Sequence, residues 1–214
     1  MMNKTKLIHK VNYDFYKEYI DDELFNNIFE KRLIKIENQY KHMHKFMKIN
    51  NLIEEYFVEI FCWTVIPKKL LFEIDTILNS HINNYTLIDL CSGNSFHTFL
   101  FNNFCKRNVI TVDIQIEKNA WIETIENDAL YYLKNYVKKF EDKILLLAWT
   151  DYDNLTFSLL KNFKGKIILS IGNYEDGDSK KYLEELKNNF ELLHHFQLKM
   201  PWDLIENIKI FRRI

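Results

Sequence analysis

Three aspartates in the middle of the chain have the placement of residues that bind a polar ligand. Asp89, Asp113 and Asp128 each stand at the end of an apolar run or just after one. Around the first of them, residues 87–96 pass from apolar side chains into Cys-Ser-Gly-Asn-Ser and then into a helical pattern. Ligands of α/β proteins bind at the carboxyl ends of such strands, where the backbone amides that begin the next helix are accessible. The three aspartates therefore predict a ligand site at one edge of a sheet.

The elements that position these residues alternate between short strands and helices. Apolar runs that suit buried strands are separated by segments with apolar residues at helical spacing. We expect strands at 86–90, 108–113, 121–125, 143–149 and 166–171, and helices at 96–104, 129–140 and 155–163. Strands this apolar, separated by helices, predict a parallel sheet that is covered on both faces.

The C-terminal part of the chain breaks this alternation. A helix is expected over 180–188, and two strand-like runs follow it at 190–199 and 207–213. Only a loop containing Pro201 separates the two runs, so they must pair as an antiparallel hairpin. The predicted fold class is α/β, with a Rossmann-like sheet of seven mostly parallel strands that ends in this antiparallel hairpin. A dinucleotide-binding domain would usually continue with strand-helix units.

The N-terminal part is predicted to be an all-helical extension. Between residues 14 and 61 the apolar residues fall at helical spacing, which indicates two or three helices. Pro67 then suits the first turn of a further helix. With 214 residues, the chain is long enough for one domain with a sizeable core. We therefore expect a helical extension over residues 1–62, packed on a Rossmann-like domain over residues 63–214.

The composition excludes several classes of protein. The chain has 29 Lys and Arg against 30 Asp and Glu, and 47% of its residues are hydrophobic, so neither a disordered nor a polybasic nucleic-acid-binding protein is expected. Polar residues interrupt each apolar run before it reaches the roughly 18 residues of a membrane span, and the first residues lack a secretory apolar core. The three cysteines have no paired spacing, so neither a disulfide nor a metal site is expected. These features favour a soluble, cytoplasmic protein.

Residues 87–96 resemble the first motif of class I, Rossmann-like S-adenosylmethionine-dependent methyltransferases, which is written acidic-x-Gly-x-Gly-x-Gly. Asp89 matches the acidic residue and Gly93 matches the middle glycine. Cys91 and Ser95 stand where the other two glycines would be. The resemblance implies that S-adenosylmethionine is the cofactor and that it binds at this loop.

Three later positions stand where members of this family carry further functional residues. Asp113 matches the acid that takes the ribose hydroxyls, and Asp128 is similar to the acid that recognises the adenine amino group. Residues 149–152, Trp-Thr-Asp-Tyr, occupy the place of an Asn/Asp-Pro-Pro-Tyr signature or of substrate-facing residues. The resemblance thus implies a cofactor region that extends over the ends of several strands.

Two segments narrow the resemblance to a group of uncharacterised methyltransferase-like proteins. Residues 61–67 resemble that group's aromatic-Ser-Trp-Ala-Ile-Pro element, and residues 147–152 resemble its Leu-Ser-Trp-Pro-Pro-Tyr element. The resemblance covers about residues 61–214. The cofactor-binding residues that it implies are Trp63, Asp89, Cys91, Ser92, Gly93, Asn94, Asp113, Ile114, Asp128 and Trp149.

The resemblance also implies a mechanism. The sulfonium charge of S-adenosylmethionine already activates the methyl group, so the protein must mainly align donor and acceptor and exclude water, without a metal. Asp151 is the candidate general base, and Tyr152 is the candidate for positioning the acceptor. The replacement of Pro-Pro by Thr150 and Asp151 argues against the chemistry of amino-methylating relatives. The acceptor stays open, with a small molecule or a protein side chain favoured over nucleic acid, and the N-terminal helices are a candidate surface for a partner protein.

Several candidate residues also have a plainer structural interpretation. Asp89 would cap the helix that follows its strand, and Asp128 would be the N-cap of the helix that begins near residue 129. Trp149 would be a core aromatic residue, and Trp63 would join the helical extension to the sheet. These alternatives stay open until the contacts of each side chain are known.

Two other functions compete with methyl transfer. The loss of two motif glycines and of the Pro-Pro pair also suits a catalytically inactive, methyltransferase-like binding or regulatory subunit. A nicotinamide-dependent oxidoreductase would suit the strand-end acid Asp113, but the sequence lacks the Gly-x-Gly-x-x-Gly spacing of that class.

Overall fold

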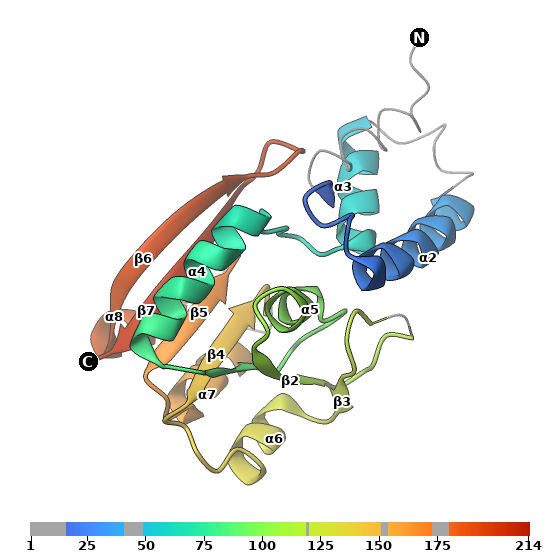
Figure 1. Ribbon diagram of the computed structural model, residues 1–214. Coiled ribbons are helices and arrows are strands. Elements are labelled where there is room, and N and C mark those ends of the chain that lie inside the picture. The colour runs from blue at the N-terminus through green and yellow to red at the C-terminus, as the bar shows by residue number, and fades with distance from the viewer. Residues whose placement is uncertain (1–15, 41–48, 119, 151–153, 173–179) are drawn as a thin grey trace. The chain divides into compact units, whose positions relative to one another are not determined.

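The computed structural model of the chain describes residues 16–40, 49–118, 120–150, 154–172 and 180–214 (Figure 1). The chain divides into two compact units. The helical unit consists of Met1–Leu70 and Lys199–Ile205, and the sheet unit consists of Leu71–Leu198 and Glu206–Ile214.

The sheet unit contains one seven-stranded sheet, in the order β3-β2-β1-β4-β5-β7-β6 (Figure 1). Strands β1 to β5 run parallel to one another, whereas β7 runs antiparallel to β5. This order confirms the predicted α/β fold class with its C-terminal antiparallel pair. The strands are β1 (Thr86–Asp89), β2 (Asn108–Asp113), β3 (Ile125–Glu126), β4 (Lys143–Ala148), β5 (Ile167–Ile171), β6 (Phe190–Lys199) and β7 (Ile205–Arg213).

The register brings the carboxyl ends of the parallel strands together. Asp89, the last residue of β1, lies opposite Thr111 of β2 and Leu146 of β4. Asp113, the last residue of β2, lies opposite Glu126 of β3. Because parallel strands end at the same edge of a sheet, the segments that follow β1 to β4 share that edge.

Helices cover both faces of this sheet, as its apolar strands predict. α4 (Lys68–His81) and α5 (Phe96–Asn103) lie on the face that is turned toward the viewer in Figure 1. α6 (Ala129–Asn135), α7 (Leu155–Asn162) and α8 (Lys180–Asn189) pack on the opposite face. There their apolar side chains form one buried core cluster with residues of β1, β4 and β5, which fixes the strands whose ends build the site.

The third strand is shorter than the sequence predicts. Only Ile125–Glu126 pairs with β2. Trp121, where the strand is predicted to begin, is 3% exposed and packs against Phe96 and Phe99 of α5, with ring centroids 5.0 and 5.2 Å apart. The predicted strand is therefore wrong except at its last residue, because burial of the indole against α5 replaces sheet pairing.

α6 ends at Asn135, whereas the sequence predicts a helix as far as residue 140. Beyond the helix, Val137 joins the buried core cluster. Phe140 packs edge-on against Phe163, with ring centroids 5.6 Å apart. The chain leaves the helix early, and both apolar side chains are then packed by tertiary contacts.

The helical unit confirms the predicted N-terminal helices over the described residues. α2 (Glu23–Tyr40) and α3 (Ile49–Ile60) are joined by a hydrogen bond of 2.9 Å from Arg32 Nη1 to the Glu59 carbonyl oxygen. Its buried aromatic core contains Tyr16, Tyr19, Phe25, Phe29, Phe57, Phe61 and Trp202. None of the helices in the described ranges is both long and apolar enough to cross a membrane. The packing of this extension on the core stays a prediction.

Candidate functional site

The loop between β1 and α5 is tied to the end of β2 by two hydrogen bonds. The Ser92 amide donates to the Val112 carbonyl oxygen at 3.2 Å. The Gly93 amide donates to Asp113 Oδ2 at 2.8 Å. The loop therefore lies over the carboxyl ends of the two strands that carry Asp89 and Asp113.

Gly93 is the most open point of this loop. Its φ of +51° lies in the left-handed region, and a Cβ added there would have no heavy atom within 4 Å. A glycine at this position is favoured by the backbone conformation and not by crowding. The space over the loop is open to a ligand.

Ser95 takes the place of the third motif glycine without changing the shape that a glycine would favour. Its φ is 62° and ψ is 25°, so this residue also adopts the left-handed conformation. Its buried hydroxyl lies 2.7 Å from Thr124 Oγ1 and donates to Ser92 Oγ at 3.1 Å. These bonds stabilise a conformation that costs an L-residue about 1–2 kcal/mol.

Asp89 is held inside the protein at the end of β1. The residue is 3% exposed, and its Oδ2 accepts a hydrogen bond of 2.8 Å from Thr98 Oγ1 of α5. Burial raises the pKa of the carboxyl group to about 7, although hydrogen bonds from Thr98 and the Cys91 amide lower it, and the charge of Asp113 raises it further. Asp89 thus links β1, the loop and α5, and its contact with a cofactor stays a prediction.

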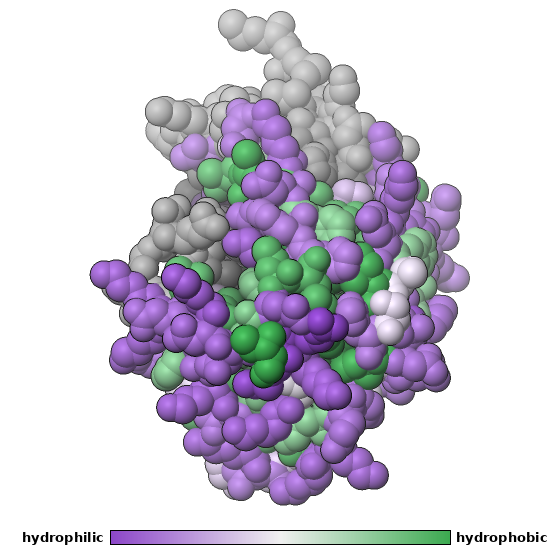
Figure 2. Space-filling view, turned by 90° about the vertical axis from the view of Figure 1, so that its left-hand side faces the viewer, coloured by the Kyte–Doolittle hydropathy of each residue, from purple (hydrophilic) through white to green (hydrophobic). Residues whose placement is uncertain are grey.

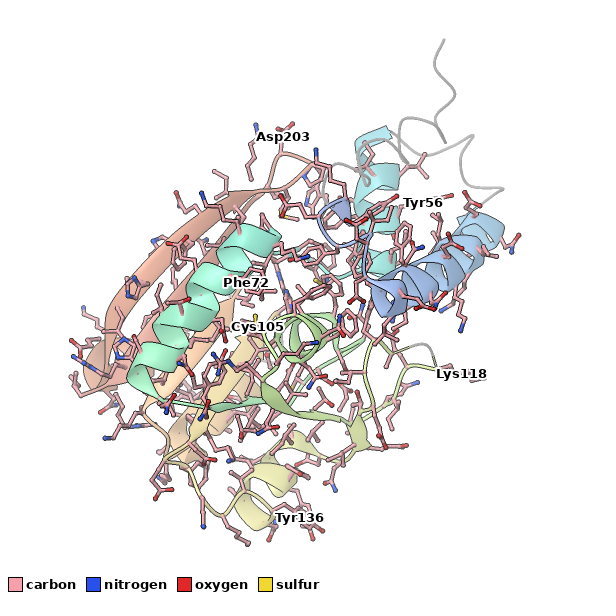
Figure 3. The ribbon with its side chains drawn as sticks, in the orientation of Figure 1. Tyr56, Phe72, Cys105, Lys118, Tyr136 and Asp203 are labelled. Carbon is pink, nitrogen blue, oxygen red and sulfur yellow. The ribbon has the colours of Figure 1, made fainter. Side chains whose placement is uncertain are left out.

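Asp113 keeps hydrogen-bonding capacity at both of its carboxylate oxygens. Oδ2 accepts from the Gly93 amide at 2.8 Å, and Oδ1 accepts from the Gln115 amide at 3.1 Å. A carboxylate oxygen can accept more than one hydrogen bond, so both oxygens can also bind ligand hydroxyls. Ile114 follows with 73% of its surface exposed, and Lys118 marks the outer end of this segment (Figure 3).

Asp128 is the N-cap of α6, which is one of the two roles predicted for it. Its Oδ1 accepts a hydrogen bond of 2.7 Å from the Tyr131 amide in the first turn of α6. The preceding residue, Asn127, donates its amide to the Asp113 carbonyl oxygen at 2.9 Å. Asp128 is therefore exposed beside the end of β2, and a contact with adenine stays a prediction.

Cys91 and Asn94 complete the loop. Burial raises the pKa of the Cys91 thiol to about 12, and the nearby charges of Asp89, Asp113 and Asp128 raise it as well. The thiol is thus protonated at neutral pH and is no nucleophile. Asn94 Oδ1 accepts from the Phe96 amide at 3.0 Å and helps to begin α5.

Trp149 stands at the end of β4 with a φ of +50°. Its amide donates to the Ile171 carbonyl oxygen at 3.0 Å. The indole lies so close to Gly172 that a Cβ added there would be 3.2 Å from the ring. Trp149 is half-buried, so packing explains part of its placement, and cofactor contact stays a prediction.

Three predicted residues are not tested by these contacts. Asp151 and Tyr152 lie outside the described residues. Trp63 belongs to the helical unit, where 41% of its surface is exposed, and its cofactor contact stays a prediction.

Two threonines that shape the site were not predicted from the sequence. Thr98 is fully buried and bonds to Asp89, and Thr124 is buried and bonds to Ser95. Thr98 stands among the aromatic and apolar residues of α5, Phe-His-Thr-Phe-Leu-Phe, and a polar residue within such a segment was the available signal.

Solved structures share this fold at low sequence identity. TrmN from Thermus thermophilus matches with a TM-score of 0.50 and 11% identity over 70% of this chain and 49% of that chain, so this chain spans about half the length of TrmN. The 1,6-didemethyltoxoflavin-N1-methyltransferase of Burkholderia thailandensis, solved with 1,6-didemethyltoxoflavin and S-adenosylhomocysteine, matches with a TM-score of 0.48 and 12% identity over 68% of this chain and 79% of that chain. No family model and no curated protein matches the sequence. The resemblance to class I methyltransferases is confirmed at the level of the fold.

Proposed function

We propose that this chain is an S-adenosylmethionine-dependent methyltransferase whose cofactor binds at the loop between β1 and α5. The observation that carries the proposal is the hydrogen bond between the Gly93 amide and Asp113 Oδ2, which joins an open glycine loop to a strand-end carboxylate. The resemblance of residues 87–96 to the first motif of such enzymes supports it, as does the shared fold.

The residues around the loop fit the parts of this cofactor. The open space over Gly93 leaves room for the ligand next to backbone amides. Asp113 would accept hydrogen bonds from the ribose hydroxyls, and the exposed side chain of Ile114 would cover an apolar face of the adenine. Asp128 Oδ2 would be available to the adenine amino group, since Oδ1 serves the helix cap.

Charge supports the same assignment. The charge of Asp113 is close enough to raise the pKa of the buried Asp89, and the Asp113 carboxylate would favour a ligand that carries a positive sulfonium. The bound cofactor supplies a methyl group that is already activated, so the chain's residues would align the acceptor and exclude water. Asp151 as general base and Tyr152 as the residue that positions the acceptor remain part of this proposal.

Isothermal titration of the full chain with S-adenosylmethionine and S-adenosylhomocysteine tests the proposal. We expect the wild-type protein to bind both, and Asp113→Asn to weaken binding by about tenfold or more, because hydrogen bonds to a charged acceptor are worth about 1.5–3 kcal/mol. Asp142→Asn is the matched control. Asp142 is an aspartate next to β4 at the opposite end of the sheet, where its carboxylate contacts Lys143.

Asp142→Asn should bind like the wild-type protein. Equal binding by Asp113→Asn and the wild type would contradict the assignment of Asp113. The wild-type protein's failure to bind either compound would contradict the cofactor assignment as a whole. The protein would then be better explained as a methyltransferase-like binding or regulatory subunit.

The contacts of the loop weaken the argument for that inactive alternative. Ser95 keeps the left-handed conformation of a motif glycine, so the loss of glycine at this position leaves the loop shape intact. The nicotinamide-dependent alternative is also less suitable, because dinucleotide-binding sheets have the order 3-2-1-4-5-6 and this sheet has β7 inserted antiparallel beside β5.

A screen of small molecules and protein substrates, with S-adenosylhomocysteine release as the readout, would identify the acceptor.

A further inference from the structure

The sheet ends in a long strand with an open edge. β6 (Phe190–Lys199) has ten residues and is the last strand in the sheet order. Within the described ranges, no strand pairs with its outer side. Figure 2 views the molecule from the side on which β6 lies in Figure 1, and apolar side chains gather in the middle of this face with hydrophilic ones around them.

One face of β6 carries three apolar side chains and one histidine. Leu192, His194, Phe196 and Leu198 alternate with the other residues and therefore point to the same face. The rings of His194 and Phe196 stack with centroids 6.2 Å apart and an interplanar angle of 6°, which agrees with a shared face. Leu192 is 51% exposed, so this face is partly open to solvent.

Few of the features that protect edge strands are present in β6. Soluble proteins protect such edges with proline, a central lysine, a bulge or very short strands. Here the charged residues stand only near the ends of the strand, with Glu191 at one end and Lys199 at the other. The edge therefore suits pairing with another strand.

We propose that β6 pairs antiparallel with β6 of a second copy of this chain, around a twofold axis at His195. This register places Leu192 opposite Leu198 and His194 opposite Phe196 of the other copy. It also places Glu191 opposite Lys199, so opposite charges meet at both ends of the interface.

The charges select this register over its neighbours. A twofold axis perpendicular to the sheet keeps each side chain on its own face of the sheet. The axis must therefore pass through a residue and not between two residues. Moving the axis by one residue changes the partner of every residue by two positions. Moving the axis to His194 would set Glu191 opposite Gln197, and moving it to Phe196 would set Lys199 opposite Leu193. Only the axis at His195 pairs both charged residues.

Both charged residues are accessible for this pairing. Glu191 contacts Arg212, and its side chain is 42% exposed. Lys199 contacts Asp203 at 3.0 Å, and its side chain is 73% exposed. Exposed ion pairs contribute little to stability, so sharing these groups with a second copy costs little.

Sedimentation equilibrium of the full chain up to about 100 µM tests the proposal. We expect a monomer–dimer equilibrium for the wild type. Glu191→Lys and Lys199→Glu, made singly, should each weaken the dimer by about tenfold, because each places like charges opposite one another twice. The double variant, which exchanges the two charges, should restore most of the affinity.

Gln197→Lys is a further variant at an exposed position. It adds a positive charge two residues from the twofold axis at His195, and this charge should also weaken the dimer. A wild-type chain that stays monomeric would overturn the proposal. A dimer whose affinity does not respond to these substitutions, or that the double variant fails to restore, would show that the copies meet elsewhere and would also overturn it. Thermal unfolding of each variant, compared with the wild type, separates lost pairing from lost folding.

Discussion

The hydroxyl oxygens of Ser95 and Thr124 lie 2.7 Å apart, although the two residues are 29 positions apart in the chain. This bond connects the loop after β1 with the segment that leads into β3. It also explains how a serine is accommodated where the family motif has a glycine, because its strained conformation is offset by a buried hydrogen bond.

Substitutions of Ser95 should separate backbone strain from hydrogen bonding. We expect Ser95→Ala to lower the free energy of unfolding by about 1–2 kcal/mol, because it removes the hydroxyl and keeps a Cβ in the left-handed region. Ser95→Gly removes the same hydroxyl but relieves the strain, so it should be closer to the wild type. Urea unfolding measures both. In a Thr124→Val background, Ser95→Ala should cost less than in the wild type, and strictly additive effects would contradict the coupling.

The two left-handed glycines should differ in their tolerance of alanine. Gly93→Ala should cost about 1 kcal/mol of unfolding free energy, since only the conformation opposes the methyl group. Gly172→Ala should cost more than that, because its φ is +122° and the added Cβ would lie 3.2 Å from the Trp149 ring. Adding Trp149→Leu should recover part of the loss at Gly172. Equal costs at both glycines would show that the contact with Trp149 is unimportant.

The order of elements could be predicted from local patterns. Pro67 immediately precedes α4, and β6 and β7, which no helix separates, are neighbours in the sheet as predicted. The third strand could not be placed in the same way. Trp121 lies in a strand-like run, but its indole is packed between aromatic side chains of α5, and such tertiary contacts override local preference.

The gathering of the candidate residues could be predicted, but their contacts could not. The aspartates at the ends of β1 and β2 lie at one edge of the sheet, as the alternation of strands and helices predicts. Whether Asp89 would be exposed to a ligand could not be deduced, because its burial depends on Thr98 from the following helix. Sequence spacing carries no information on which oxygen of Asp128 caps α6 and which stays available.

A largely buried ion pair at the amino-terminal ends of β1 and β2, the edge of the sheet opposite the site, should dominate local stability. Arg107 binds Asp75 with both Nε and Nη2, at 2.6 and 2.8 Å, and Tyr85 donates its hydroxyl to the same carboxylate at 2.7 Å. Burial and Asp75 raise the pKa of Tyr85, so its hydroxyl stays a donor. Arg107→Met should cost about 3–5 kcal/mol of unfolding free energy, because the Asp75 charge is then left buried. Tyr85→Phe should lower the free energy of unfolding by only about 1 kcal/mol. Urea unfolding measures both variants, and a larger decrease for Tyr85→Phe than for Arg107→Met would contradict the prediction.

Asp89 should make stability depend on pH in the direction opposite to most carboxylates. Its pKa in the folded protein is raised from 3.8 to about 7, chiefly by burial. Between these two pH values the folded state holds a proton that the unfolded state has released. The stabilisation is therefore fully present below about pH 3.8, declines as the pH rises, and is lost above about pH 7. At about 1.4 kcal/mol per pH unit, the total change is on the order of 4 kcal/mol.

The comparison of wild type with Asp89→Asn isolates this contribution. Asparagine does not titrate, so the stability of the variant relative to the wild type should increase from about pH 4 to about pH 8 in urea unfolding. Asp142→Asn is the control, because the hydrogen bond from Lys143 lowers the pKa of Asp142 and its difference from the wild type should be constant above about pH 5. A constant difference between wild type and Asp89→Asn would mean that the Asp89 carboxyl group is ionised in the folded protein throughout this range. In that case solvent or a cation would have to reach the Asp89 carboxylate, and burial at the end of β1 would not raise its pKa.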